Sequence, residues 1–451
     1  MIVVLSQGCA ANFGDGEKIA RILSQKSEVT FEFPEAKAAL TMNAAHSINA
    51  ENPENAASTS SKKPANLDNS ANLAATHVEK PEAFYLNVCT VKGNAGAMKL
   101  LRKAASTYPG VPIYITGCAP KDFREEALRA VPHVQFTSLK ELEASATLTR
   151  NVLRESPFVG IVNIEEGCLD ACAFCSTHLV KGRLHSFAPQ TIVDQVQALV
   201  DDGCLEIQLT GQDCACYGFD INTNLAELTQ RILTHVNGNY RIRLGMGNPR
   251  HVLGYQEALL DCFTDDRIYK FIHIPVQSGS ENVLKAMNRR HTARDYATLA
   301  HAFTERFNKF TLSTDLIVGY PVETAADFND TLKLLKETRP TVCNITRFVA
   351  RPGTVAARLE ASSQAVPDAV KHERSAILAE AFQQIALENN REWIGDECTV
   401  ITEKQGYRAG TTIARNAAYR PVALQGTFPA GQTLRVRITD AEPFALIAKP
   451  L

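Results

Sequence analysis

Three cysteines close together in the sequence are the residues best suited to bind a metal. Cys168, Cys172 and Cys175 lie in GCLDACAFCSTH, directly after an expected strand, so their thiolates would share one short loop. Thiolates bind both zinc and iron–sulfur clusters. A zinc knuckle would need a fourth ligand, which His178 could supply, but zinc motifs usually pair their ligands in two separate knuckles. The spacing therefore favours an iron–sulfur cluster and leaves zinc as the alternative.

A cubane cluster held by three cysteines leaves one iron without a protein ligand. That iron can chelate the amino and carboxylate groups of S-adenosylmethionine (SAM), and an electron passed to the sulfonium then releases a 5′-deoxyadenosyl radical. In this motif the chain resembles the radical SAM superfamily. The resemblance implies that the three cysteines form the catalytic cluster site.

A second set of cysteines stands at the ends of strands. Cys9, Cys89 and Cys118 close the segments LSQGC, YLNVC and YITGC. Loops after the carboxyl ends of parallel strands line one crevice, so these three residues could converge on one ligand. A single cysteine of this kind would more often be a buried small hydrophobic side chain. Three at matching strand ends favour a second cluster.

The elements that would position the second set alternate between strand and helix, which is typical of a parallel sheet. We assign 1–150 to this α/β domain, with expected helices over 15–25, 97–108 and 121–130. Its expected strands are IVVLSQGC, TFEF, AFYLNVC, VPIYITGC and VQFTS. The pattern stops at 43–82, where 40 residues include no aromatic, glycine or cysteine. Such a composition predicts a disordered insertion.

A second alternating series surrounds the three-cysteine loop. We assign it to 155–388, with a helix over 192–200 and a long helix over 371–393. Its six expected strands are FVGIVNI, LEIQLTG, YRIRLG, FIHIPVQS, TLSTDLIVG and VCNITRF, which predict a barrel-like parallel sheet. The last segment, 390–451, breaks into short β-rich pieces separated by Gly and Pro, which predicts a small all-β barrel.

Longer motifs make the resemblance more specific. QGCAANFGDGE, LNVCTVKGNA and ITGCAP look like the N-terminal domain of the radical SAM methylthiotransferases. EEGCLDACAFC, LTGQDCACYG, HIPVQSGSENVLKAMNRRHT, STDLIVGYPVETAADF and TRFVARPGT are similar, in order, to the central domain of that family. The resemblance implies an α/β fold class with three parts, namely a flavodoxin-like domain, a partial radical SAM barrel and a C-terminal TRAM barrel.

The family resemblance also implies cofactors and partners. It predicts two [4Fe-4S] clusters, one on Cys168, Cys172 and Cys175 and one on Cys9, Cys89 and Cys118. The first would cleave SAM, and the second would carry or supply the sulfur inserted into a C–H bond. SAM would serve as both methyl donor and radical source. An electron donor such as flavodoxin or ferredoxin and a source of sulfide are also expected.

Five residues at strand ends are candidates for contacts with SAM. Small or polar side chains there let the backbone approach a ligand, and a carboxylate can hold a ribose hydroxyl or an ammonium group. An ordinary strand-to-helix turn is the alternative for each of them. The candidates are Gly211, Gln212, Asp213, Asn248 and Gln277. Cys214 and Cys216 beside them could touch a cluster, although tolerated small side chains are the more common case.

A local excess of cations near the C-terminus indicates contact with RNA. The segment 404–439 contains no acidic residue, although the whole chain has a net charge of −2. On a small β-barrel such a patch predicts contact with the RNA backbone, with a merely solvated basic face as the alternative. The cations are Lys404, Arg408, Arg415, Arg420, Arg435 and Arg437.

The segments VCTVKG, CSTHLVKGRL and GMGNPR look most like the archaeal and eukaryotic members of the family. Those members act on N6-threonylcarbamoyladenosine in tRNA. The resemblance thus predicts 2-methylthiolation of this nucleoside at position 37 of lysine-type, ANN-decoding tRNA. Isopentenyladenosine in tRNA and a ribosomal-protein aspartate are alternative substrates. An RNA-binding iron–sulfur protein without turnover is an alternative of another class.

Composition bounds the class of protein more than its function. The 451 residues are 45% hydrophobic and 21% charged, ordinary values for a globular chain. The N-terminus lacks a basic region before its short apolar run, and no apolar stretch reaches the length of a membrane span. We therefore expect a cytoplasmic protein with no membrane partner. Twelve cysteines in that compartment favour metal binding over disulfides.

Overall fold

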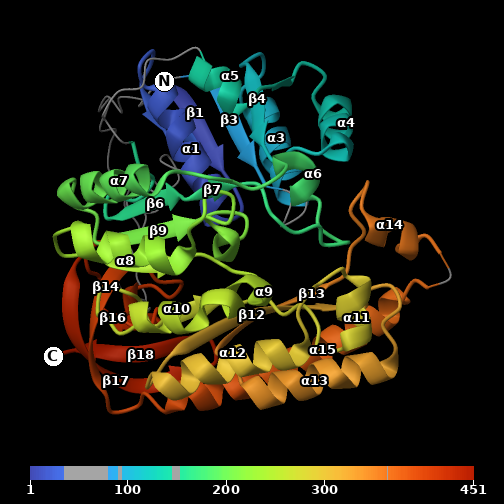
Figure 1. The fold of residues 1–451 in the computed structure, drawn as a ribbon. Coiled ribbons are helices and arrows are strands. Elements are labelled where there is room, and N and C mark those ends of the chain that lie inside the picture. Colours follow the sequence, from blue (N-terminus) through green and yellow to red (C-terminus); the bar gives the residue numbers. More distant parts are fainter. Residues whose placement is uncertain (35–79, 90–93, 145–152, 363) are drawn as a thin grey trace, which may run out of the picture.

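The computed structural model describes residues 1–34, 80–89, 94–144, 153–362 and 364–451, so most of the expected insertion at 43–82 lies outside the described residues. Three bodies follow one another along the chain (Figure 1). Among the described residues, no helix is long and apolar enough to cross a membrane.

The first body is a five-stranded parallel sheet in the order β2-β1-β3-β4-β5, the order of flavodoxin-like folds. Val3 on one face of β1 packs with the core under α3 and α4, whereas Ile2 and Val4 on the other face pack against α1. This alternation places helices on both faces of the sheet. The strands are β1 (Ile2–Ser6), β2 (Val29–Thr30), β3 (Ala83–Val88), β4 (Ile113–Gly117) and β5 (Gln135–Phe136), and the helices are α1 (Ala10–Leu23), α3 (Asn94–Thr107), α4 (Lys121–Ala130) and α5 (Leu139–Ala144).

The second body is a partial barrel of six parallel strands, all at the expected places. Two three-stranded sheets, β10-β9-β6 and β11-β12-β13, are joined by a parallel bridge between Ile242 and Ile268. The strands are β6 (Val159–Asn163), β9 (Glu206–Thr210), β10 (Arg241–Leu244), β11 (Phe271–His273), β12 (Thr311–Val318) and β13 (Val342–Arg347). β6 and β13 are edge strands, so the barrel stays open between them.

Helices cover the outer face of the partial barrel (Figure 1), and most of them share one apolar core with its strands, whereas the two short helices over 281–286 and 355–360 pack in a separate cluster with Tyr320 and Phe348. They are α7 (Pro189–Asp201), α8 (Leu225–His235), α9 (Pro249–Val252), α10 (Gln256–Cys262), α11 (Glu281–Ala286), α12 (Ala293–Arg306), α13 (Ala325–Thr338), α14 (Val355–Glu360) and α15 (Asp368–Arg391). Capping boxes of Thr292 with Asp295 and of Thr324 with Asp327 fix the starts of α12 and α13.

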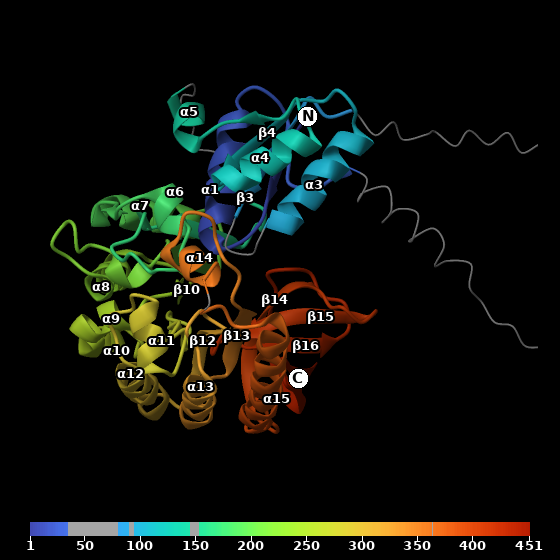
Figure 2. The same ribbon diagram turned by 90° about the vertical axis from the view of Figure 1, so that its right-hand side faces the viewer.

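The third body is a closed barrel in the order β14-β15-β16-β18-β17, and it lies beside β13 and α15 (Figure 2). The expected β-rich pieces correspond to β14 (Glu397–Gln405), β15 (Thr411–Asn416), β16 (Pro421–Gln425), β17 (Thr433–Glu442) and β18 (Ala445–Pro450). Alternate residues such as Val400, Val422 and Val436 are fully buried in its core with Trp393.

The turn between β15 and β16 joins this barrel to the partial barrel at the amino ends of strands β9, β11 and β12. Thr311 donates a hydrogen bond to the carbonyl of Ala418 at 2.6 Å. The Tyr419 hydroxyl donates to Glu206 Oε1 at 2.9 Å, and its ring packs against those of Tyr269 and Phe271. The two bodies are therefore joined by buried polar contacts as well as apolar ones.

The structure differs from the sequence-based expectations mainly in short elements. The expected strand TFEF is only Val29–Thr30, and VQFTS is only Gln135–Phe136, because both lie at the edges of the first sheet. A two-stranded ribbon of β7 (Glu165–Glu166) and β8 (His185–Ser186) was not predicted from the sequence. That ribbon holds the three-cysteine loop.

Candidate active site

The loop of Cys168, Cys172 and Cys175 runs from β7 to a short helix, α6 (Thr177–Lys181). Gly167 has a φ of +80°, and a Cβ there would lie 2.1 Å from the Arg183 carbonyl oxygen, so only glycine fits. A bridge between Cys168 and Arg183 closes the loop, and the Cys175 amide donates to the Cys172 carbonyl at 3.1 Å. All three thiols are partly exposed. The loop therefore presents them at the surface of one pinned turn.

Donors surround the sulfur atoms of this loop. The Asp170 amide donates to Cys168 Sγ, and Arg289 Nη1 donates to Cys172 Sγ, both at 3.4 Å. Burial raises the pKa of Cys172 to about 11, while the nearby Arg289 cation opposes that rise. A hydrogen bond from the Cys216 thiol lowers the pKa of Cys168. Such donors suit thiolate ligands, which carry negative charge.

The spacing of the ligands speaks against a single zinc ion. Zinc binds thiolates at about 2.3 Å, which needs a compact ligand set. Among the described residues, the only three metal-ligating side chains with atoms all within 4.8 Å of one another are Asp170, Asp213 and His251. Neither cysteine trio meets that spacing, and sets of three thiols are the donors that an iron–sulfur cluster takes, so cluster binding by the two trios stays the prediction.

Cys9, Cys89 and Cys118 follow β1, β3 and β4, three neighbouring strands of the first sheet. Cys9 and Cys89 share a hydrogen bond, which together with burial raises the pKa of Cys9. Gly8, with a φ of +117°, leaves the space beside Cys89, whose Sγ would lie 2.6 Å from a Cβ at that position. The structure brings this expected trio together, and its all-thiol donor set fits an iron–sulfur cluster.

The two trios face each other where the first body meets the second. Burial raises the pKa of Cys118 to about 11, and the charges of Lys181 and Cys175 both act on it. Lys181, in the helix that ends the three-cysteine loop, pairs with Asp15 Oδ2 of α1 at 3.0 Å. Asn163 of β6 donates to the other oxygen of Asp15 at 2.9 Å. This buried network fixes one trio relative to the other.

The residues after β9 that are expected to contact SAM already form hydrogen bonds within the protein. The Gln212 side chain accepts a hydrogen bond from the Gly167 amide at 2.7 Å, and the Asp213 amide donates to Glu165 at 3.0 Å. Asp213 is 3% exposed, and burial raises its pKa. A Cβ at Gly211 would lie 2.0 Å from Glu165, so this turn lies tightly against β7. Contact of these residues with SAM stays a prediction.

Asn248 and Gln277 also lie at the carboxyl ends of barrel strands. Asn248 is the N-cap of α9, and its amide nitrogen donates to Asp170 at 2.5 Å. Gln277 has a φ of +77°, an unusual value for a residue other than glycine, and lies in a parallel bridge with Leu316. Backbone outliers of this kind cluster at ligand sites, which supports Gln277 as a candidate.

Sequence reasoning missed the role of Asp170, which lies between two cysteines of the loop. It accepts hydrogen bonds from Asn248 and from Arg250, and it contacts His251 Nε2 at 3.2 Å. Asp170 is 8% exposed, and burial alone would raise its pKa, but the hydrogen bond to His251 together with the nearby charges, Arg250 and Arg289 among them, lowers it. With its oxygens already in contact with Asn248, Arg250 and His251, this carboxylate anchors the loop to the end of β10 rather than offering a vacant metal site.

Two of the six expected RNA-contacting cations do not lie on the open surface. Arg415 makes a two-point ion pair with Glu403, with Nη2 to Oε2 at 3.0 Å, and lies over the ring of Tyr419. Arg420 is 4% exposed and donates to Asn390 and Thr341. Neither residue therefore lies on an open basic face of the barrel, and contact of the six cations with RNA stays a prediction. The other four cations are exposed, namely Lys404, Arg408, Arg435 and Arg437.

Family models match two parts of the chain. The Radical SAM superfamily matches residues 162–335, and the TRAM domain matches residues 391–451. The chain is similar to the "probable threonylcarbamoyladenosine tRNA methylthiotransferase" of Archaeoglobus fulgidus, with 41% identity over 64% of this chain and 66% of that protein. A protein of the same name from Pyrococcus horikoshii is 34% identical over 77% of this chain and 85% of its own length.

A solved structure shares the fold of the chain. The radical SAM methyltransferase TsrM from Kitasatospora setae, with cobalamin and a [4Fe-4S] cluster bound, matches with a TM-score of 0.50. The match covers 79% of this chain and 76% of that one, at 12% identity. At that identity the likeness concerns the arrangement of the domains alone.

Proposed function

The chain belongs to the threonylcarbamoyladenosine tRNA methylthiotransferases, and on that premise we propose that it converts N6-threonylcarbamoyladenosine at position 37 of tRNA to its 2-methylthio derivative. Its cofactors are SAM and two [4Fe-4S] clusters. The convergence of two cysteine trios at one junction carries the proposal, because inserting sulfur into a C–H bond needs both a radical source and a sulfur carrier near one substrate atom.

The chain's own residues have separate tasks in this proposal. Cys168, Cys172 and Cys175, all free thiols, would hold one cluster, and the free thiols of Cys9, Cys89 and Cys118 would hold the other. When bound, the first cluster supplies the electron that cleaves SAM to the 5′-deoxyadenosyl radical, and the second carries the sulfur to be inserted.

Residues around the two cysteine trios hold the trios in position. Lys181 and Asp15 hold the three-cysteine loop against the first sheet, while Asp170 holds it to the end of β10. Gly211, Gln212, Asp213, Asn248 and Gln277 would line the SAM site at the strand ends. Such rigid support matters because an error of about 1 Å in placing reacting atoms slows a reaction about a hundredfold.

The exposed cations of the C-terminal barrel would contact the tRNA backbone. Arg435 and Arg437 are 69% and 57% exposed and share Glu397, whereas Arg408 is 79% exposed beside Glu442. These surface pairs are weak, so a phosphate can compete for each cation. Lysine-type tRNA, a flavodoxin or ferredoxin electron donor, a sulfide source and a cytoplasmic location stay predictions.

The nucleosides of tRNA test this proposal directly. The chain should be expressed in a host that makes threonylcarbamoyladenosine but no methylthiolated nucleosides, and digested tRNA should be analysed by mass spectrometry. We expect 2-methylthio-N6-threonylcarbamoyladenosine to appear. Methylthiolated isopentenyladenosine alone would indicate the other tRNA substrate, and no methylthio nucleoside at all would contradict the proposal.

An RNA-binding iron–sulfur protein without turnover is separated from the enzyme by a second assay. The protein should be reconstituted with iron and sulfide without oxygen and then given SAM and a reductant. We expect two clusters per chain and release of 5′-deoxyadenosine. Two clusters without deoxyadenosine would favour the binding protein.

A further inference from the structure

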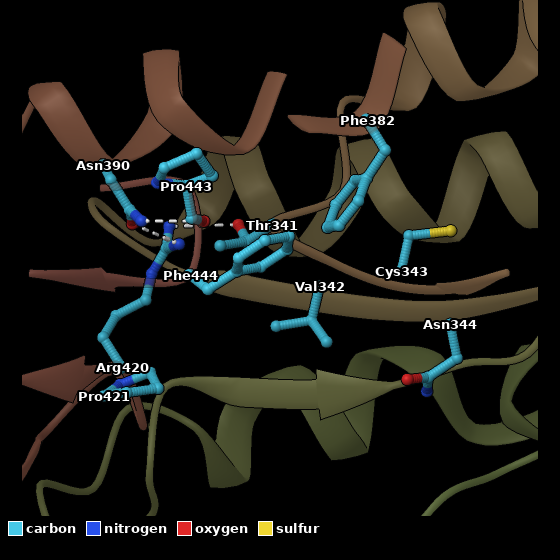
Figure 3. Close-up of a pocket in the computed structure, with 10 residues that line it drawn as sticks. All are labelled: Thr341, Val342, Cys343, Asn344, Phe382, Asn390, Arg420, Pro421, Pro443 and Phe444. Carbon is cyan, nitrogen blue, oxygen red and sulfur yellow. Dashed lines mark hydrogen bonds between the residues drawn. The ribbon is translucent and has the colours of Figure 1, made fainter. Parts of the chain in front are cut away.

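A pocket of about 260 Å³ lies where the C-terminal barrel meets β13 and α15 (Figure 3). It lies at the amino end of β13, whereas the cysteines of both trios follow the carboxyl ends of strands. Its lining comes from four segments, which include Val342 of β13, Phe382 and Asn390 of α15, Arg420 before β16, and Phe444 between β17 and β18. β13 is an edge strand, so the pocket lies beside the open side of the partial barrel.

The pocket contains a buried cation without a counter-ion. Arg420 is 4% exposed, and its two terminal nitrogens donate to Asn390 Oδ1 at 2.8 Å and Thr341 Oγ1 at 3.0 Å. Both partners are neutral, and Nε is buried with no partner. Burial lowers the pKa of Arg420 to about 9, opposed only by the charge of Glu392, and no carboxylate among the described residues forms an ion pair with Arg420. An anion in the pocket would supply the missing charge.

An aromatic side chain is exposed at the rim of the same pocket. Phe444 is 63% exposed, whereas Phe382 behind it is 6% exposed, with ring centroids 6.3 Å apart. The turn that carries Phe444 is held in place, because Asn390 donates to the carbonyls of Glu442 at 2.7 Å and Pro443 at 3.2 Å. Asn390 thus supports both the cation and the aromatic ring (Figure 3).

A fixed aromatic face beside a guanidinium that has no carboxylate partner is the combination that single-stranded RNA sites use, the ring for a base and the cation for a phosphate. We propose that this pocket binds one unstacked nucleotide of the RNA substrate, with its base against Phe444 and its phosphate toward Arg420. The inference rests on the proposed function in that it takes RNA as the substrate. The nucleotide differs from the one that is modified, because the pocket is at the opposite end of the strands from the cysteines.

Binding of a tRNA transcript to the full-length, cluster-reconstituted chain tests the aromatic half of the site. Phe444→Ala should raise the Kd about tenfold, since stacking of one base on an aromatic ring is of that order. The slope of log Kd against log salt concentration should not change, because stacking releases no counterions. Ile377→Ala is the matched control, as Ile377 is a 38% exposed side chain of α15 outside the pocket. A Kd for Phe444→Ala within twofold of the control would overturn the proposal.

The charged half of the site gives an independent readout. Arg420→Gln should weaken binding and lower the salt slope by about one, the value for one lost phosphate contact. If this variant does not fold, a photoreactive benzoylphenylalanine at position 444 replaces it and should crosslink to one nucleotide of the tRNA. No crosslink, or crosslinks spread over the whole tRNA, would count against the pocket, as would tight binding of a small organic carboxylate that tRNA cannot displace.

Failure of this inference is distinguishable from failure of the proposed function, since the binding assay needs no turnover. If Phe444→Ala weakens tRNA binding but no methylthio nucleoside ever forms, the pocket stands and the proposed activity fails. If the product forms and Phe444→Ala binds like the wild-type chain, the activity stands and the pocket fails.

Discussion

Cys216 offers a measurable link between the fold and the chemistry of the three-cysteine loop. It ends a 3₁₀ turn after β9 and is fully buried, and its thiol forms a hydrogen bond with that of Cys168. This bond and burial raise the pKa of Cys216, so its proton stays in place and Cys168 is the acceptor. A donor to a cluster sulfur stabilises the reduced, more negative cluster and thus raises its potential.

The size of the effect follows from the strength of one such bond. A hydrogen bond contributes about 0.5–1.5 kcal/mol, which for transfer of one electron corresponds to roughly 20–60 mV. We therefore expect Cys216→Ala to lower the midpoint potential of this cluster by that amount. Cys214→Ala is the matched control, because Cys214 is also fully buried but its thiol faces the Leu209 carbonyl at 3.9 Å.

Electron paramagnetic resonance during a redox titration measures the potential. The titration should use a background in which Cys9, Cys89 and Cys118 are all alanine, so that only one cluster is present. A shift for Cys216→Ala and none for Cys214→Ala is the expected result. Equal shifts in both variants, or no shift in Cys216→Ala, would refute the role of this hydrogen bond.

Three further predictions follow from the same geometry. Cys89→Ala should keep reductive cleavage of SAM, measured as 5′-deoxyadenosine, but lose the methylthio product, and equal loss of both would contradict separate tasks for the two trios. Burial raises the pKa of Glu17 from 4.5 to about 7 at 8% exposure, so the folded state loses stability as pH rises and this carboxyl ionises. Glu17→Gln should therefore raise the free energy of unfolding by about 3 kcal/mol at pH 8 and by less than about 1 kcal/mol at pH 5. Urea denaturation at the two pH values measures this difference. An increase in the free energy of unfolding that is the same at both pH values would disprove this cause. Lys181→Met should lower the free energy of unfolding by about 3 kcal/mol in the same assay, because it leaves Asp15 buried without its cation. Adding Asp15→Asn should recover part of this loss, and no recovery would exclude the ion pair as the cause.

The sequence was sufficient to predict most of the strands and the proximity of Cys9, Cys89 and Cys118 for a physical reason. Strands buried on both faces are continuous apolar runs, as in IVVL at β1, and glycines with positive φ before Cys9 and Cys118 marked the turns that follow such strands. Cysteines placed after neighbouring parallel strands must meet at one edge of the sheet. These signals are local or follow from topology.

The burial of the two arginines and the loop anchors could not be predicted in the same way. The partners of Arg420 lie 30 and 79 residues away in the sequence, and the partner of Arg415 lies just before the acid-free segment that suggested RNA contact. Likewise, Asp170 meets Asn248 across 78 residues. Side chains of this kind acquire their role only when distant elements pack together.

Methyl transfer to tRNA in a defined reaction tests the central claim most directly. The anaerobically reconstituted chain should be incubated with a reductant, sulfide, SAM labelled in its methyl group, and tRNA that carries N6-threonylcarbamoyladenosine. We predict label in the 2-methylthio derivative of that nucleoside, and none when the tRNA carries unmodified adenosine at position 37. Label that is absent from tRNA while 5′-deoxyadenosine accumulates, or label in unmodified adenosine, would contradict the account.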